Sequence, residues 1–83
     1  MAKLNLLYVY DIKPQNPSKK GSIKRNFYYH MEKLRPFIRR ATESVILTSK
    51  EHESTIDGFF MRFLNDVEVY KCDITKLTIL KKM

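Results

Sequence analysis

The chain has 83 residues, 43% of them hydrophobic, and it carries a formal net charge of +7 with one cysteine. These values exclude an intrinsically disordered protein, an internal disulfide and a structural zinc site built from cysteines. No segment approaches the ~20 consecutive apolar residues that cross a bilayer, and the N-terminus lacks a signal-peptide pattern. We therefore expect one cytoplasmic domain over residues 1–83, with no membrane partner.

Positive charge is concentrated in the first half of the chain. Residues 1–40 hold ten Lys or Arg and two acids, a net charge of +8, whereas residues 41–83 have a net charge of −1. A charge that served only solubility would be spread more evenly. The asymmetry indicates a polyanionic partner, with nucleic acid as the first candidate.

The apolar run at residues 4–10 predicts a buried central strand, which leads directly into Asp11. A carboxylate at the end of a rigid strand in a basic protein suggests a hard metal ion beside a phosphate backbone. On the strand alone, the more common explanation is that Asp11 begins a turn, as aspartate often does. Residues 12–21 then form a loop, because two prolines and a glycine break any periodicity.

The first predicted helix runs from Ser22, a good N-cap, to about Arg35, where Pro36 stops it. Its apolar stripe indicates an amphipathic helix that lies on a sheet. His30 falls within this stripe and is expected to be a core histidine rather than a catalytic base. The stripe comprises Ile23, Phe27, His30, Met31 and Leu34.

The second predicted helix begins at Ser54, with Asp57 three residues later in capping-box spacing. Gly58 lies inside this helix, where it costs about 1 kcal/mol relative to alanine, so we expect close backbone packing there. The apolar stripe comprises Ile56, Phe59, Phe60, Phe63 and Leu64.

The remaining segments read as strands. Residues 38–48 form a strand region long enough to bend into a hairpin, and residues 67–72 form the next strand, with Cys72 as a buried structural thiol. A last strand is expected at 77–80. This order predicts an α+β, ferredoxin-like β-α-β-β-α-β sandwich with an extra C-terminal strand. A chain this small favours a homodimer, in which residues 75–83 cover a sheet edge of the partner.

Basic residues crowd the start of the first helix, where they oppose the helix dipole. This arrangement disfavours folding but suits an anion, because backbone amides and cations then converge on a phosphate. We expect these residues, and two arginines of the second strand region, to contact nucleic-acid phosphates rather than to form a merely solvated face. They are Lys19, Lys20, Lys24, Arg25, Arg39 and Arg40.

Taken in order along the chain, these features resemble the CRISPR-associated protein 2 family. The first strand ends in Tyr10, Asp11 and Ile12, a basic helix follows, the next strand region carries Thr42–Thr48, and a β-rich tail closes the chain. The sequence departs from the family in its long loop with two prolines, and in Ile46, where the family commonly has an aromatic residue.

The resemblance implies a role in CRISPR adaptation and antiviral defence. Family members form homodimers that bridge the CRISPR integrase and hold the double-stranded DNA to be inserted, and several act as metal-dependent endonucleases on RNA or DNA. Asp11 is then the catalytic residue and the ligand of Mg²⁺, and a two-fold axis near the first strand would bring two Asp11 side chains together. Tyr10 and Ser44 are expected to support this site.

Three functions remain open. The chain is a non-catalytic duplex-binding scaffold, a Mg²⁺-dependent nuclease such as a virulence-associated ribonuclease toxin of the same fold, or an unrelated ferredoxin-like nucleic-acid-binding module. The last is disfavoured, because no strand has the aromatic-rich, glycine-flanked pattern of an RNA recognition motif.

Overall fold

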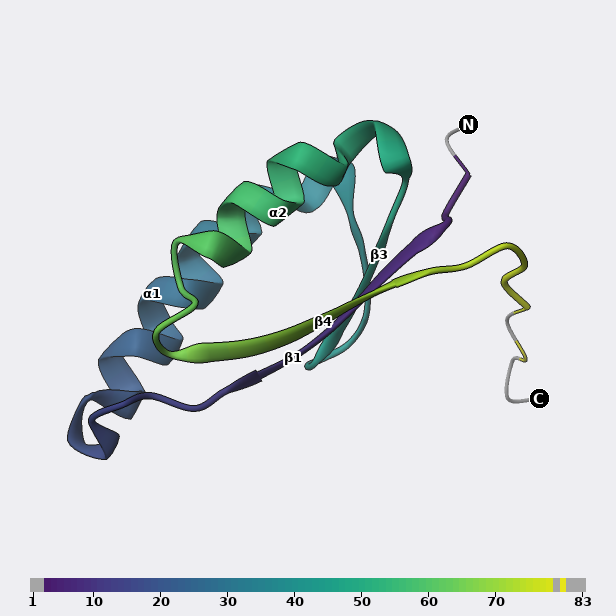
Figure 1. Cartoon of the computed structure of the whole chain (residues 1–83). Helices are drawn as coiled ribbons and strands as arrows, with labels where there is room; N and C mark the ends of the chain where they lie inside the picture. Colours follow the sequence, from purple (N-terminus) through teal and green to yellow (C-terminus); the bar gives the residue numbers. More distant parts are fainter. Residues whose placement is uncertain (1–2, 79, 81–83) are drawn as a thin grey trace.

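The structure is a computed structural model that describes residues 3–78 and 80. The strands form an antiparallel sheet in the order β2-β3-β1-β4, and the two α-helices lie on one side of it (Figure 1). This α+β arrangement is compatible with a ferredoxin-like fold. The elements are β1 (Leu6–Ile12), α1 (Lys20–Glu32), β2 (Arg39–Thr42), β3 (Val45–Thr48), α2 (Glu53–Met61) and β4 (Val67–Asp73).

The central strand β1 has two faces of different character. Leu6, Tyr8 and Tyr10 are buried and face the helices, while Val9 and Asp11 are exposed on the other side. Side chains alternate in this way along any strand. We call the side away from the helices the open face. The sequence prediction of a central apolar strand is confirmed, with bounds shifted by two residues toward Ile12.

Aromatic rings fill the space between the sheet and the helices. The Tyr8 ring stacks on Phe60 with centroids 5.3 Å apart, and Phe27 packs against both Tyr10 and Phe59. Such contacts add to the free energy gained by burying the rings. The core cluster comprises Leu6, Tyr8, Tyr10, Phe27, Met31, Leu34, Ile46, Ile56, Phe59, Phe60, Phe63 and Val67.

Helix α1 starts earlier than predicted. It begins at Lys20, because a 3-10 turn over Pro17–Lys19, capped by the Asn16 side chain, leads directly into it. The predicted N-cap role of Ser22 is therefore wrong: its hydroxyl donates to the Lys19 carbonyl oxygen at 3.1 Å. The helix ends at Glu32, before a further 3-10 turn that contains Pro36.

Helix α2 also differs from its predicted form. No side chain caps its N-terminus, and the Asp57 carboxylate accepts hydrogen bonds from Tyr8 and Lys71 instead of completing a capping box. A Cβ atom added at Gly58 would meet nothing within 4 Å, so the expected close packing is wrong. Leu64, predicted to be in the core, lies beyond the helix end and is 55% exposed.

Residues 38–48 form the hairpin β2–β3, with a bulge between Arg40 and Thr42.

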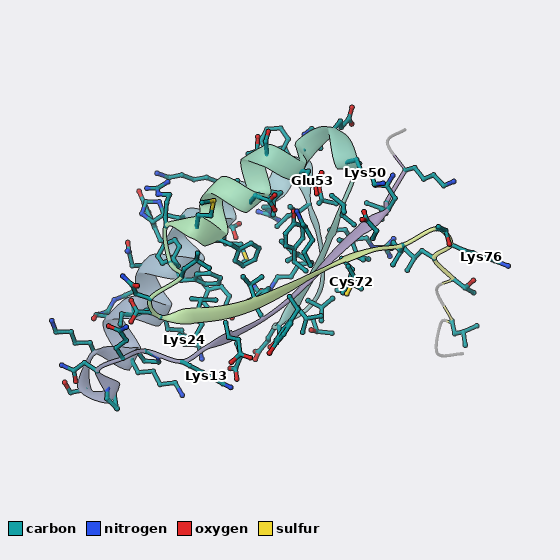
Figure 2. All side chains as sticks on the ribbon, in the orientation of Figure 1. Lys13, Lys24, Lys50, Glu53, Cys72 and Lys76 are labelled. Carbon is teal, nitrogen blue, oxygen red and sulfur yellow. The ribbon has the colours of Figure 1, made fainter. Side chains whose placement is uncertain are left out.

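Two further predictions, on the burial of Cys72 and of His30, need correction. Cys72 is exposed on the open face rather than buried, and its side chain points away from the helices (Figure 2). His30 is only half-buried. Leu77 and Thr78 belong to no strand in this single chain, and Ile79 of the predicted last strand lies outside the described residues.

Within the described residues, neither helix combines the length and the apolar character needed to cross a membrane. Helix α1 is the longer of the two, at 13 residues.

Candidate nucleic-acid interface

Helix α1 turns one side toward the hairpin β2–β3. Lys20, Lys24 and Tyr28 recur every four residues, so they lie on the same side of the helix. There they line a hollow of about 170 Å³. The end of β1 and the hairpin turn, including Ser44, supply the other wall. The full lining is Tyr10, Asp11, Ile12, Lys20, Lys24, Tyr28, Glu43 and Ser44.

A second hollow, of about 480 Å³, continues along the same side of α1. Tyr28 lines both hollows, so they adjoin at its ring. Arg35 and Arg40 line the second hollow together with Met31, Glu32 and Ile38. We call this surface the basic groove, defined by Lys20, Lys24, Tyr28, Arg35 and Arg40.

Tyr28 organises the middle of the basic groove. Its hydroxyl donates to the Glu43 carbonyl oxygen at 3.0 Å, which ties α1 to the hairpin turn. The guanidinium carbon of Arg40 lies 4.7 Å from the centre of the Tyr28 ring, a cation–π contact. This contact favours a position of the Arg40 guanidinium beside the groove. The sequence analysis did not identify Tyr28, although its spacing from Lys20 and Lys24 carried the signal.

The predicted phosphate-contacting residues do not all lie together. Lys20, Lys24 and Arg40 line the basic groove, whereas Lys19 and Arg25 are exposed but line neither hollow. Arg39 lines a different hollow, on the open face, which Arg40 also lines and which includes Leu47 and Leu77. Of the six predicted residues, Lys20, Lys24 and Arg40 thus line one continuous surface.

Tyr10 and Ser44, the two residues expected to support the site, meet at the end of β1. The Tyr10 backbone amide donates to the Ser44 carbonyl oxygen at 2.9 Å. The Tyr10 side chain points into the core, where its hydroxyl donates to the Met31 sulfur at 3.5 Å. Burial is the main cause that raises the pKa of Tyr10 to about 12.

Asp11 lies on the open face with its side chain 70% exposed. Glu68 is its direct partner across the strand pair β1–β4. Lys13 lies between them, with its ammonium nitrogen 3.9 Å from the Asp11 carboxylate and 2.9 Å from that of Glu68. Glu68 also accepts a hydrogen bond from Tyr70. The bonds from Tyr70 and Lys13 hold the pKa of Glu68 below its ordinary value.

The sequence analysis missed Glu68 and Lys13. Glu68 follows Asp11 by more than fifty residues, and only the strand register places the two together. Asp11 and Glu68 are the carboxylates here that suit a magnesium ion, which takes one or two carboxylates and completes its shell with water. Among residues 3–78 and 80, no group of three or more His, Cys, Asp or Glu side chains is arranged to hold a metal.

No protein-family model, curated protein or solved structure matches this chain. The resemblance to the CRISPR-associated protein 2 family therefore depends on the residues quoted for it, above all Tyr10, Asp11 and Ile12.

Proposed function

We propose that the protein binds the phosphate backbone of a nucleic-acid duplex along the basic groove. The observation that carries this proposal is the convergence of Lys20, Lys24 and Arg40 around Tyr28. None of these three cations forms an ion pair with an acid in the described part of the chain. Their charge is therefore available to neutralise phosphates and release counterions.

Backbone binding suits this groove better than reading of bases. Tyr28 is half-buried and Arg40 lies over one face of its ring, so that face is not free for a base to stack on. Lysine and arginine contacts to phosphate fix position without selecting sequence. We therefore expect similar affinity for duplexes of different sequence.

The finer assignment is a homodimeric scaffold in CRISPR adaptation, which holds double-stranded DNA for the integrase in antiviral defence. It is supported by the resemblance in Tyr10–Ile12, which ends β1, and in Thr42–Thr48, which spans the hairpin turn and β3. A two-fold axis would repeat the basic groove and so lengthen the duplex that one assembly contacts. The C-terminal residues 75–83 are proposed to pack on the partner chain.

A second candidate function is Mg²⁺-dependent cleavage of RNA or DNA, as in the same family or in a virulence-associated ribonuclease toxin. The observation that favours it is Glu68 directly opposite Asp11, which gives each chain two carboxylates on one face. Bound Mg²⁺ would polarise a phosphate and activate water. Asp11 and Glu68 are the residues that would hold it, and Lys13 would have to move away.

The groove is tested by two substitutions that remove the same charge from neighbouring positions. Lys24→Gln removes a cation that lines the groove, and Arg25→Gln removes one that does not. Affinity for a fluorescent DNA duplex is measured by anisotropy over a series of salt concentrations. We expect Lys24→Gln to weaken binding a few-fold and to reduce the salt slope by about one unit, with Arg25→Gln close to wild type.

Equal losses for the two variants would mean that net charge, not the groove, attracts the duplex. No measurable duplex binding by the wild type would overturn the proposed function. Circular dichroism controls for folding, since both side chains are exposed on the helix surface.

A further inference from the structure

A separate hollow of about 450 Å³ lies between α1 and α2. It shares no lining residue with the basic groove. Its volume falls within the range of roughly 300–1,000 Å³ that is usual for small-molecule sites. The end of α1 and the turn after it supply His30, Lys33 and Leu34, and α2 with its C-cap supplies Thr55, Gly58, Phe59 and Arg62.

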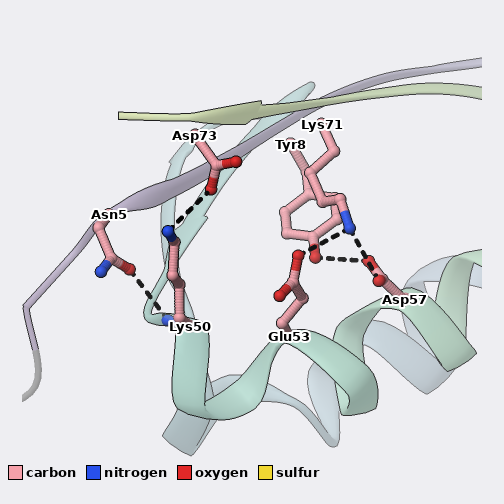
Figure 3. Close-up of polar contacts among 7 residues, drawn as sticks. All are labelled: Asn5, Tyr8, Lys50, Glu53, Asp57, Lys71 and Asp73. Carbon is pink, nitrogen blue, oxygen red and sulfur yellow. Dashed lines mark hydrogen bonds and ion pairs between the residues drawn. The ribbon is translucent and has the colours of Figure 1, made fainter. Parts of the chain in front are cut away.

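The charged side chains around this hollow are all basic. Lys33 and Arg62 are exposed, and neither forms an ion pair with an acid within the described residues. The acids of α2 do not compensate them. Glu53 and Asp57 point toward the sheet, where Lys71 bonds them at 2.8 and 2.9 Å (Figure 3). An anion in the hollow would meet cations without a competing carboxylate.

Gly58, inside α2, lines the hollow. A glycine inside a helix lowers helix stability relative to alanine. Gly58 does not have a positive φ, and a Cβ atom there would meet nothing within 4 Å. Neither backbone conformation nor packing therefore requires glycine. Its missing side chain leaves open space above the α2 backbone, beside Thr55 and Arg62.

The floor of the hollow is apolar. Leu34 and Phe59 are largely buried, and their remaining exposed surface lines the hollow. A ligand that fits must therefore combine an apolar body with a negative charge. The Arg62 guanidinium is the first group that would receive that charge. The Lys33 ammonium lies 4.8 Å above the ring of Tyr29, which does not line the hollow, so Lys33 would have to turn toward the ligand to join Arg62.

We propose that this hollow binds a small organic phosphate, with its phosphate at Arg62 and Lys33 and its apolar or aromatic body on Leu34 and Phe59 over Gly58. Arginine suits this task because its planar fork pairs with two phosphate oxygens. The Thr55 hydroxyl and the His30 ring supply further hydrogen-bonding groups. This site is independent of duplex binding in the basic groove.

The first test titrates the full chain with adenosine 5′-monophosphate, and separately with inorganic phosphate and with adenosine, while amide shifts are followed by NMR. We expect saturable shifts at Thr55, Gly58 and Arg62 with the nucleotide, and at least roughly tenfold weaker binding of either fragment. Shifts spread over all the basic residues, or equal binding of inorganic phosphate, would overturn the proposal.

The second test uses variants. Arg62→Gln should weaken nucleotide binding roughly tenfold through loss of a charge-assisted pair. Gly58→Ala should raise the melting temperature by a few degrees and yet weaken binding, because its methyl group enters the hollow. If Gly58 had only a structural role, Gly58→Ala would leave the affinity for the nucleotide unchanged or raise it. Arg25→Gln, outside the hollow, should bind the nucleotide like wild type. Unchanged affinity in both Arg62→Gln and Gly58→Ala would overturn the site.

Discussion

Asp11 on β1 and Glu68 on β4 are direct cross-strand partners, and the Lys13 ammonium lies 3.9 Å from one carboxylate and 2.9 Å from the other. Like charges directly opposite each other destabilise a strand pair. Lys13 relieves that repulsion in the single chain. The same ammonium lies between the two carboxylates that would hold the proposed Mg²⁺. Binding of that ion would therefore have to displace Lys13.

We predict that Lys13→Met tightens Mg²⁺ binding by about fivefold or more, since a unit charge at 4 Å contributes about 1 kcal/mol even in water. Asp11→Asn should abolish that binding. Isothermal titration calorimetry at low salt measures both. Lys33→Met, which removes a lysine between the helices, serves as the matched control and should bind like wild type. Equal affinity in wild type and Lys13→Met would show that the pair is not a cation site.

If the chain is a nuclease, cleavage should follow the same carboxylates. We predict that Asp11→Asn and Glu68→Gln each lose Mg²⁺-dependent cleavage of RNA and DNA. Glu68 lines neither hollow of the basic groove, so Glu68→Gln should keep the duplex affinity of the wild type, whereas Asp11→Asn removes a negative charge beside Lys20 and Lys24 and should keep or raise it. Gel assays with Mg²⁺ and with a chelator measure this. Wild-type activity in Asp11→Asn would remove any catalytic role for Asp11.

The sequence predicted most of the fold because its strong signals are local. The near-continuous apolar run at residues 4–10 and the phenylalanines of α2 are patterns of residues a few positions apart, and they indicate the central strand and the core. The site is different. Asp57 was assigned to a helix cap from its spacing to Ser54, but Tyr8 and Lys71 approach it from distant strands. Contacts of this kind depend on strand register, which a single sequence does not specify.

The Tyr28 ring should matter to duplex binding through Arg40, not through its hydroxyl. Tyr28→Leu removes the ring under the guanidinium and should weaken binding by about two- to fivefold, the equivalent of an exposed cation–π contact. Tyr28→Phe keeps the ring and loses the bond to the Glu43 carbonyl, so it should bind like wild type. Anisotropy titration measures both. Equal weakening would assign the effect to the hydroxyl and the hairpin turn.

The open face of the sheet and the C-terminal residues 75–83 are the parts of the chain that concern the proposed dimer. Leu47 is almost fully buried although it lies on the open face, and Leu77 lines the same hollow beside it. The edge strand β4 has one neighbour in the sheet, which leaves its outer edge for a strand from a second copy. Deletion of residues 75–83 should therefore convert a dimer into a monomer in analytical ultracentrifugation.

A matched pair of substitutions checks that result in the full chain. Leu77→Asp should shift the equilibrium toward monomer, because it places a charge in the segment that is proposed to pack on the partner chain, while Lys76→Gln should not. A wild-type chain that sediments as a monomer at micromolar concentration contradicts the dimer. A truncated chain that still dimerises contradicts the role of the tail.

The Asp57 carboxylate, which accepts hydrogen bonds from Tyr8 and Lys71, should make the stability of the fold depend on pH (Figure 3). The Tyr8 hydroxyl donates to Asp57 Oδ1 at 2.6 Å, and Lys71 Nζ lies 2.9 Å from Oδ2. Burial alone would raise the pKa of Asp57, but the bonds from Tyr8 and Lys71 outweigh it and the pKa is lowered. A lowered pKa in the folded state contributes stability above the unfolded value of about 4 and loses it as the pH falls through the folded value.

We therefore predict that the free energy of unfolding of the wild type falls as the pH drops below about 4, and that this part of the fall is missing in Asp57→Asn. Tyr8→Phe should lose about 1–2 kcal/mol at pH 7, because it removes a partly buried hydrogen bond to a charged group. Tyr70→Phe removes a similar bond to the exposed Glu68 and should cost much less. Urea denaturation at pH 7 and pH 3 measures all four proteins. Equal losses of free energy in Tyr8→Phe and Tyr70→Phe would mean that burial does not strengthen the Tyr8–Asp57 bond. An unchanged fall of stability at low pH in Asp57→Asn would mean that other carboxylates cause the acid sensitivity.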